Sequence, residues 1–215
     1  LGILERGHLI ETDRSGLVAG YVGQTAIKTN ELVDKAIGGV LFIDEAYALG
    51  NTATNQGDFG NEAIQTLLKR MEDDRGKFFV FAAGYPDNMA QFLKMNPGLS
   101  SRFDKILKFE DYDDQQLYQI AQFIFKSEKY RLSKKATDKL VSFCQTLHQS
   151  RDKYFGNART IKKFTEEVIK NQNLRIAEST TMDPKSEITI DEIDLISANT
   201  WSNDNIKQAS TIGFK

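Results

Sequence analysis

Four stretches in the first half of the chain have the length and composition of β-strands. Residues 40–43 are apolar without interruption, and Lys77–Ala83 is nearly so. A continuous apolar run is typical of a parallel strand that is buried on both faces. His8–Thr12 predicts a shorter strand, and Lys105–Phe109 predicts a further one. The pattern therefore indicates a parallel sheet.

Segments with helical spacing of apolar residues separate these strands. Thr25–Ile37 predicts a helix that Gly38-Gly39 terminates. Glu62–Glu72 is amphipathic, and Asn88–Leu93 predicts a short helix. We expect loops at Gly50–Gly60 and Asn96–Phe103. Strands that alternate with helices are the pattern of an α/β fold.

The pattern changes near Glu110, and helical spacing dominates beyond it. We expect helices at Gln115–Lys126, Ser133–Leu147 and Ala158–Ile176. Thr189, followed by Glu192, has the form of a capping box and predicts a short helix that ends at Ile196. We therefore expect an α/β subdomain (1–109), a small all-α subdomain (110–198) and a polar C-terminal tail (199–215).

The amino-acid composition excludes several classes of protein. The 215 residues are 40% hydrophobic and 27% charged, which is ordinary for a globular protein. A net charge of -2 offers no general attraction to nucleic acid, so a nucleic-acid partner is not expected. The single cysteine, Cys144, excludes an internal disulfide framework and fits a reducing, cytoplasmic compartment. Cys144 lies in an apolar helical pattern, so we predict that it is a core residue. No apolar run reaches the length of a membrane span.

Two adjacent carboxylates, Asp44 and Glu45, follow the strand at 40–43. Ligands of open α/β sheets bind beyond the carboxyl ends of the strands, so this is where a binding site is expected. The alternative is a core strand that leaves the sheet through a charged turn.

The segment Tyr21-Val22-Gly23 presents an aromatic residue between two glycines, Gly20 and Gly23. Glycines permit sharp turns, so the aromatic could be displayed on a loop. The alternative is that Tyr21 folds back onto the core. Arg102 and Arg159 are, taken singly, ordinary surface charges.

Five features occur together in a fixed order. They are Tyr21-Val22-Gly23, the strand that ends in Asp44-Glu45, the strand that ends at Tyr85, Ser101-Arg102-Phe103, and Gly156-Asn157-Ala158-Arg159. With this set the chain resembles the AAA+ ATPases, in particular the branch of the Rubisco activase CbbX, stage V sporulation protein K and the type VII secretion protein EccA. The phrases Gly-Gly-Val-Leu-Phe-Ile-Asp-Glu-Ala-Tyr, Ala-Gly-Tyr, Asn-Pro-Gly and Gly-Asn-Ala-Arg carry the resemblance, which covers residues 1 to about 175.

The resemblance implies a role for each feature. Asp44 and Glu45 correspond to the Walker B motif, in which Asp44 orients Mg²⁺ through water and Glu45 is the general base for attack on the γ-phosphate of ATP. Arg102 corresponds to an arginine finger that acts in trans on the nucleotide of a neighbouring subunit. Arg159 corresponds to sensor 2. The segment 21–23 corresponds to the first pore loop, which grips a protein substrate.

The sequence departs from the family pattern in three places. Tyr85 stands at the sensor 1 position, where many AAA+ proteins have Asn or Thr, and Ser100 stands where some relatives have a second arginine. The phosphate-binding loop Gly-x-x-x-x-Gly-Lys-[Ser/Thr] does not occur in the sequence. In the family this loop precedes the segment that begins at Leu1, so we expect a fragment that does not hydrolyse ATP alone.

The resemblance implies an intact parent that is an ATP- and Mg²⁺-dependent, ring-forming, hexameric motor acting on a protein partner. Two other functions remain open: a non-catalytic interaction or assembly module, and an AAA+ ATPase associated with nucleic acid. The sequence does not identify the protein substrate.

Overall fold

The chain divides into two compact units, Leu1–Leu107 and Lys108–Lys215, which we call the α/β unit and the helical unit. The computed structural model describes residues 4–21, 23–50, 59–152, 155–179 and 188–195. The loop predicted at Gly50–Gly60 and the tail predicted beyond residue 198 lie largely or wholly outside the described residues.

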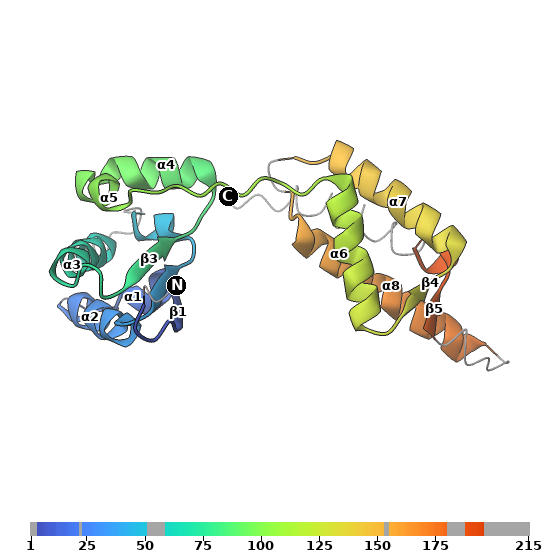
Figure 1. Cartoon of the computed structure of the whole chain (residues 1–215), viewed down its shortest axis with the longest axis horizontal. Coiled ribbons are helices and arrows are strands. Elements are labelled where there is room, and N and C mark those ends of the chain that lie inside the picture. Colours follow the sequence, from blue (N-terminus) through green and yellow to red (C-terminus); the bar gives the residue numbers. More distant parts are fainter. Residues whose placement is uncertain (1–3, 22, 51–58, 153–154, 180–187, 196–215) are drawn as a thin grey trace. The chain divides into compact units, whose positions relative to one another are not determined.

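A three-stranded parallel sheet forms the centre of the α/β unit (Figure 1), in the order β1-β2-β3. Its strands are β1 (Leu9–Thr12), β2 (Val40–Ile43) and β3 (Phe79–Ala82). The register aligns the last residues of all three strands, Thr12 with Ile43 and Ile43 with Ala82. The prediction of a parallel sheet is confirmed. All three strands end at the same level, so their carboxyl ends form one edge of the sheet.

The pair Gly38-Gly39 joins the starts of the three strands. The N–H groups of Arg6 and Gly7 both donate to the carbonyl of Gly38, each at 2.9 Å. Gly38 N–H donates to Lys77 O at 2.7 Å, and Gly39 O accepts from Phe79 N–H at 3.1 Å. Gly38 has φ +83°, a left-handed conformation that glycine adopts without steric cost. We call Gly38-Gly39 with these partners the glycine node.

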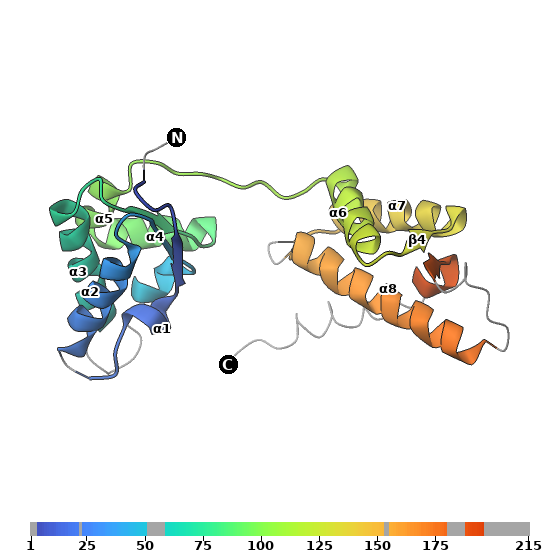
Figure 2. The same cartoon turned by 60° about the horizontal axis from the view of Figure 1, so that its bottom comes forward.

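Helices α2 and α3 lie side by side (Figures 1 and 2), and with the sheet they enclose the core of this unit. The helical segments are α1 (Arg14–Leu17), α2 (Gln24–Ala36), the 3₁₀ segment η1 (Ala46–Gly50), α3 (Phe59–Asp73), α4 (Pro86–Met95) and α5 (Pro97–Arg102). The amphipathic face predicted for α3 is buried, with Ala63, Ile64, Leu67 and Leu68 in the core. No described helix of the chain is both long enough and apolar enough to cross a membrane.

The two faces of the sheet differ in burial. Leu41 and Ile43 of β2 are buried in the core, whereas Phe79 and Phe81 of β3 are 42% and 46% exposed. The prediction that Lys77–Ala83 is a fully buried strand is therefore wrong for these phenylalanines. The described residues pack closely against one face of the sheet and cover the other only in part.

No strand forms at Lys105–Phe109, and this prediction is also wrong. Ile106 is 82% exposed and Phe109 is 90% exposed. A strand requires a neighbour that accepts and donates its backbone hydrogen bonds. Among the described residues none pairs with this segment, so its apolar composition alone does not produce a strand.

The helical unit packs α6 (Asp114–Ser127) against both α7 (Lys134–Gln149) and α8 (Ala158–Glu178). Helix α6 begins in a capping box, in which Asp113 accepts from Gln116 N–H at 2.7 Å and Gln116 accepts from Asp113 N–H at 3.0 Å. Phe143 stacks on Phe164 across α7 and α8 with ring centroids 3.9 Å apart. Cys144 is buried in this core, as predicted, and burial raises the pKa of its thiol to about 12.

A small parallel pairing of β4 (Arg131–Leu132) with β5 (Thr189–Ile190) adds a strand element to the helical unit. Thr189 is therefore a strand residue, and the capping box predicted at Thr189 is wrong. The capping interaction occurs two residues later, where Asp194 Oδ2 accepts from Asp191 N–H at 2.8 Å. Residues 192–195 are helical after this cap.

Candidate functional site at the carboxyl edge of the sheet

Backbone hydrogen bonds fix the position of Asp44 and Glu45 at the carboxyl edge of the sheet. Asp44 N–H donates to Thr12 O at 2.8 Å, which ties the end of β2 to β1. Ala46 N–H donates to Ala83 O at 3.0 Å, which ties the following turn to β3. The two carboxylates therefore stand on a backbone that is held on both sides, where ligands of α/β sheets are expected.

Asp44 is exposed and has one carboxylate oxygen available. Its Oδ1 accepts from Glu45 N–H at 3.0 Å, and Oδ2 has no hydrogen bond within the described part of the chain. Asp44 borders a cavity of 440 Å³ that is also lined by Glu11, Thr12, Asp13, Gly16 and Phe42. A solvent-facing carboxylate oxygen suits Mg²⁺, which keeps much of its water shell. The described residues contain no group of three or more His, Cys, Asp or Glu side chains that could hold a metal ion.

Glu45 has a left-handed backbone, with φ +47°. A side chain disfavours this region because its Cβ crowds the following carbonyl. The conformation turns the chain from β2 into η1, where Ala48 N–H donates to Glu45 O at 2.8 Å. The carboxylate of Glu45 is exposed as a result. Backbone strain of this kind concentrates at functional sites.

Tyr47 is a site residue to which the sequence analysis gave no role. Its hydroxyl interacts with the side chains of Glu45 and Asn88. Burial raises the pKa of Tyr47, and the negative charge of Glu45 raises it further. Gly84 leaves room for the ring, because a Cβ at that position would lie 2.7 Å from Tyr47 Cδ1. The sequence signal was the short distance from Glu45 along the chain, but the contact with Asn88 depends on packing of η1 against α4.

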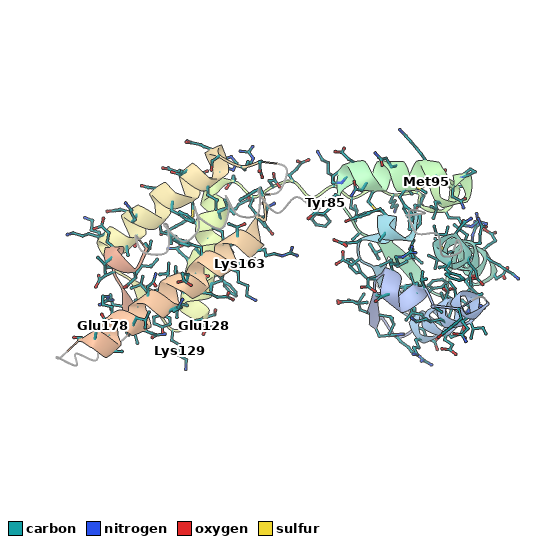
Figure 3. All side chains as sticks on the ribbon, turned by 180° about the vertical axis from the view of Figure 1, so that it is seen from behind. Tyr85, Met95, Glu128, Lys129, Lys163 and Glu178 are labelled. Carbon is teal, nitrogen blue, oxygen red and sulfur yellow. The ribbon has the colours of Figure 1, made fainter. Side chains whose placement is uncertain are left out.

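Tyr85 lies at the same edge, after the end of β3. It is the N-cap residue of α4, and its carbonyl accepts from Met89 N–H at 2.9 Å. Figure 3 shows its side chain at that end of the helix, and it is 60% exposed. The structure thus brings Tyr85 to the same sheet edge as Asp44 and Glu45.

Arg102 is the last residue of α5, a helix where the sequence analysis predicted a loop. Asn96 accepts from Gly98 N–H at 2.8 Å and Pro97 occupies the first turn, and both are helix-start signals. The Arg102 guanidinium turns back onto its own unit, where Nη2 lies 3.6 Å from Glu72 Oε2 on α3.

Tyr21 is 73% exposed, so it does not fold back onto the core. Gly23, with φ +79°, is the N-cap residue of α2. Val22 lies outside the described residues.

Arg159 belongs to the helical unit, in the first turn of α8, and is exposed. Asn157, two residues earlier, holds this helix start to the beginning of the unit. It donates from Nδ2 to Asp111 Oδ1 at 2.7 Å and accepts from Tyr112 N–H at 2.9 Å. Asn157 also has a positive φ, +48°.

Residues 4–111 match the profile of the ATPase family associated with various cellular activities (AAA), and residues 113–205 match that of the AAA lid domain. Stage V sporulation protein K of Bacillus subtilis is 42% identical over 82% of this chain and 54% of its own length. CbbX of Cereibacter sphaeroides is 37% identical over 91% of this chain and 63% of its own length. The ESX-1 secretion system protein EccA1 of Mycolicibacterium smegmatis is 37% identical over 96% of this chain, which spans only 38% of that protein.

The fold is also found among solved structures. The AAA domain of FIGL-1 superposes with a TM-score of 0.61 over 89% of this chain, at 16% sequence identity. The fold class predicted from the sequence, an α/β core followed by a helical lid, agrees with the family match and with this superposition.

Proposed function

The chain belongs to the AAA family of ATPases, and on that premise we propose that the full-length protein is an ATP-hydrolysing motor that remodels a protein partner. In this proposal the motor is a hexameric ring in the cytoplasm. The observation that carries the proposal is the adjacent pair Asp44 and Glu45, exposed on a fixed turn at the carboxyl edge of a parallel sheet.

Glu45 is the general base of the proposed reaction. Its carboxylate accepts a proton from water as that water attacks the γ-phosphate. Bound Mg²⁺ would neutralise charge on the phosphates, and Asp44 would hold it through water. We propose that residues outside this chain supply the phosphate-binding loop, so the 215-residue chain alone does not hydrolyse ATP.

The two arginines complete the proposed site. Arg102 acts in trans, because a guanidinium neutralises charge that develops on phosphate oxygens in the transition state. Arg159 senses the γ-phosphate from the helical unit. Tyr85, at the same sheet edge, takes the sensor 1 position in this proposal. The side chain of Tyr21 supports a pore loop at 21–23, since it is exposed and free to contact a protein chain.

Substitution of Glu45 by Gln in the full-length protein tests the proposal. Gln keeps the size and hydrogen-bonding capacity of Glu but does not take up a proton. We expect ATP binding to persist and turnover to fall by about 10²–10⁴-fold. Steady-state hydrolysis and nucleotide binding, measured on the same preparation, separate these two effects.

Asp87→Asn is the matched control, because Asp87 is an exposed carboxylate in the first turn of α4 near the same sheet edge. It should hydrolyse ATP at the wild-type rate. Arg102→Ala should be inactive alone, and mixing it with Glu45→Gln subunits should restore part of the turnover at interfaces that pair the intact groups. Wild-type turnover by Glu45→Gln would reject the proposal, and absence of rescue in mixed rings would reject action in trans.

A further inference from the structure

Two arginines at helix α3 are held very differently. Arg70 belongs to the helix, and Arg102 contacts it through Glu72. Arg70 is bound tightly, with Nη2 at 2.6 Å from Asp34 Oδ1 and Nε at 2.8 Å from Asp74 Oδ2. The side chains of Arg70 and Asp74 are 18% and 16% exposed. Short, charge-assisted contacts of this kind fix a guanidinium in one position. Arg70 is therefore a structural arginine that joins α3 to α2.

Arg102 is held loosely. Its Nη1 lies 3.5 Å from Gly98 O and 3.5 Å from Ser101 Oγ, and its Nη2 lies 3.6 Å from Glu72 Oε2. Its Nε is buried and, within the described residues, has no hydrogen-bond partner. A buried donor without a partner raises the free energy of the position in which it is held. The guanidinium therefore gains hydrogen bonds if it leaves this position.

Glu72 is the one side-chain charge in contact with Arg102 among the described residues, and the contact is weak. Its Oε2 also lies 3.4 Å from Nη2 of Arg75, so the carboxylate is shared between two guanidinium groups. Glu72 is half exposed, and water and salt screen a pair of this kind. A phosphate carries more charge than a carboxylate and offers oxygens that a guanidinium binds in pairs. Phosphate can therefore displace Glu72.

We propose that Glu72 restrains Arg102 in a resting position against α3 and releases it when the phosphates of a neighbouring subunit become available. This inference rests on the proposed role of Arg102 as a trans-acting finger. Glu72 is a positioning residue in this scheme, since it acts on the reaction only through Arg102. The loose contacts and the unpaired Nε make the resting position easy to leave.

The first test uses the 215-residue chain and the mobility of the arginine side chains. We expect Glu72→Gln to lower the ¹⁵N order parameter of the Arg102 Nε–H group, because the charged partner is lost. Arg70 is the internal control and should not change. Arg75→Gln is the matched variant, since it removes the other partner of Glu72 and should leave Arg102 ordered. An unchanged Arg102 signal in Glu72→Gln overturns the inference.

The second test uses the full-length protein and the dependence of ATPase rate on protein concentration. A partly exposed pair contributes up to about 1 kcal/mol, which is about fivefold in an equilibrium constant. Glu72→Gln should therefore lower the protein concentration for half-maximal activity by up to about fivefold, with the maximal rate unchanged. A lower maximal rate would overturn the inference, because it would mean that Glu72 holds Arg102 in its active position.

Arg102→Ala separates failure of the inference from failure of the proposed function. If Arg102→Ala retains wild-type turnover, the finger assignment and the restraint are both rejected. If Arg102→Ala is inactive while Glu72→Gln changes neither mobility nor concentration dependence, only the restraint is rejected.

Discussion

Phe81 on β3 and Phe164 on α8 both lie in regular elements, yet Phe81 is 46% exposed and Phe164 is 1% exposed. The difference extends to the units that contain them. The α/β unit packs one face of its sheet and leaves apolar side chains on the other face partly exposed. The helical unit encloses its core between α6, α7, α8 and the segment that contains Ile190 and Leu195, and Phe125 and Phe164 are each 1% exposed.

The proposed site residues are divided unequally between the two units. Four of the residues proposed to act on ATP, namely Asp44, Glu45, Tyr85 and Arg102, belong to the unit with the partly open sheet. The helical unit contributes Arg159 and a self-contained core. Both units have a buried core, so we expect each to depend on its core residues for stability, whereas only the α/β unit also exposes apolar side chains of its sheet.

The largest expected effect is loss of the aromatic stack in the helical unit. Phe164→Ala removes a buried ring that stacks on Phe143, and large aromatics in cores cost about 3–5 kcal/mol on truncation to Ala. Phe123→Ala is the matched control, because Phe123 is 73% exposed on α6 and its loss should cost no more than about 0.5 kcal/mol. Urea unfolding followed by circular dichroism measures both. Equal losses for the two variants would contradict the enclosed core described here.

The next effect is a pH dependence that originates at Cys144. Burial raises the thiol pKa from 9.0 to about 12, so above pH 9 the unfolded chain releases a proton that the native state retains. The contribution of Cys144 to the free energy of unfolding is fully present below pH 9. It is lost as pH rises toward 12, by at most about 1.4 kcal/mol per pH unit. Stability of wild type and of Cys144→Ala, measured across this range, gives the difference in slope. If the free energy of unfolding of the two proteins changes with pH in parallel, Cys144 is not the cause of the pH dependence.

The smallest effect compares one strained residue in each unit. Glu45 has φ +47°, and Lys129, labelled in Figure 3, has φ +65°. Lys129 follows the end of α6 in a Schellman arrangement, where Tyr130 N–H donates to Phe125 O at 2.8 Å and where glycine is preferred. Glycine at either position should add about 1 kcal/mol of stability.

Only Glu45→Gly should abolish hydrolysis in the full-length protein, and Lys129→Gly should leave it unchanged. Glu45→Ala is the control for loss of the side chain without relief of the backbone, and it should not stabilise. Thermal melting of the four proteins, together with their ATPase rates, tests the contrast. A Glu45→Gly variant that is no more stable than Glu45→Ala would show that the turn is not strained.

Much of the fold was predictable because local pattern and tertiary environment agree. The strand at 40–43 is apolar, and its parallel neighbours satisfy its backbone, so Asp44 and Glu45 reach the sheet edge as expected. Lys105–Phe109 contains three apolar residues and two lysines, and it has no strand neighbour in the described chain, so its apolar residues alone do not make it a strand. The glycine and serines of Asn96–Phe103 predict a loop, whereas Asn96-Pro97 at its start is a helix-start signal, and the structure has a helix there.

The unpredicted part of the site depends on contacts between distant segments. Glu72 reaches Arg102 only because α3 packs against α5, and Tyr47 reaches Asn88 only because η1 packs against α4. A capping box can be predicted from the sequence only when its residues are not taken up by another interaction, such as strand pairing. Asp113 keeps its cap, whereas Thr189 pairs with Arg131 in the small sheet and leaves capping to Asp194.

The glycine node has a consequence for the order in which the molecule can be made. Gly38 is bonded both to the segment before β1 and to Lys77, so the starts of the three strands cannot be joined until Lys77 has left the ribosome. Until then β1 and β2 lack their third strand, β3. Pairing between strands that are distant in sequence is also slow. The helical unit follows later in synthesis, and α6 and α7 are neighbours in sequence as well as in space. Translation thus delivers the slow-forming sheet first and the fast-forming helices last.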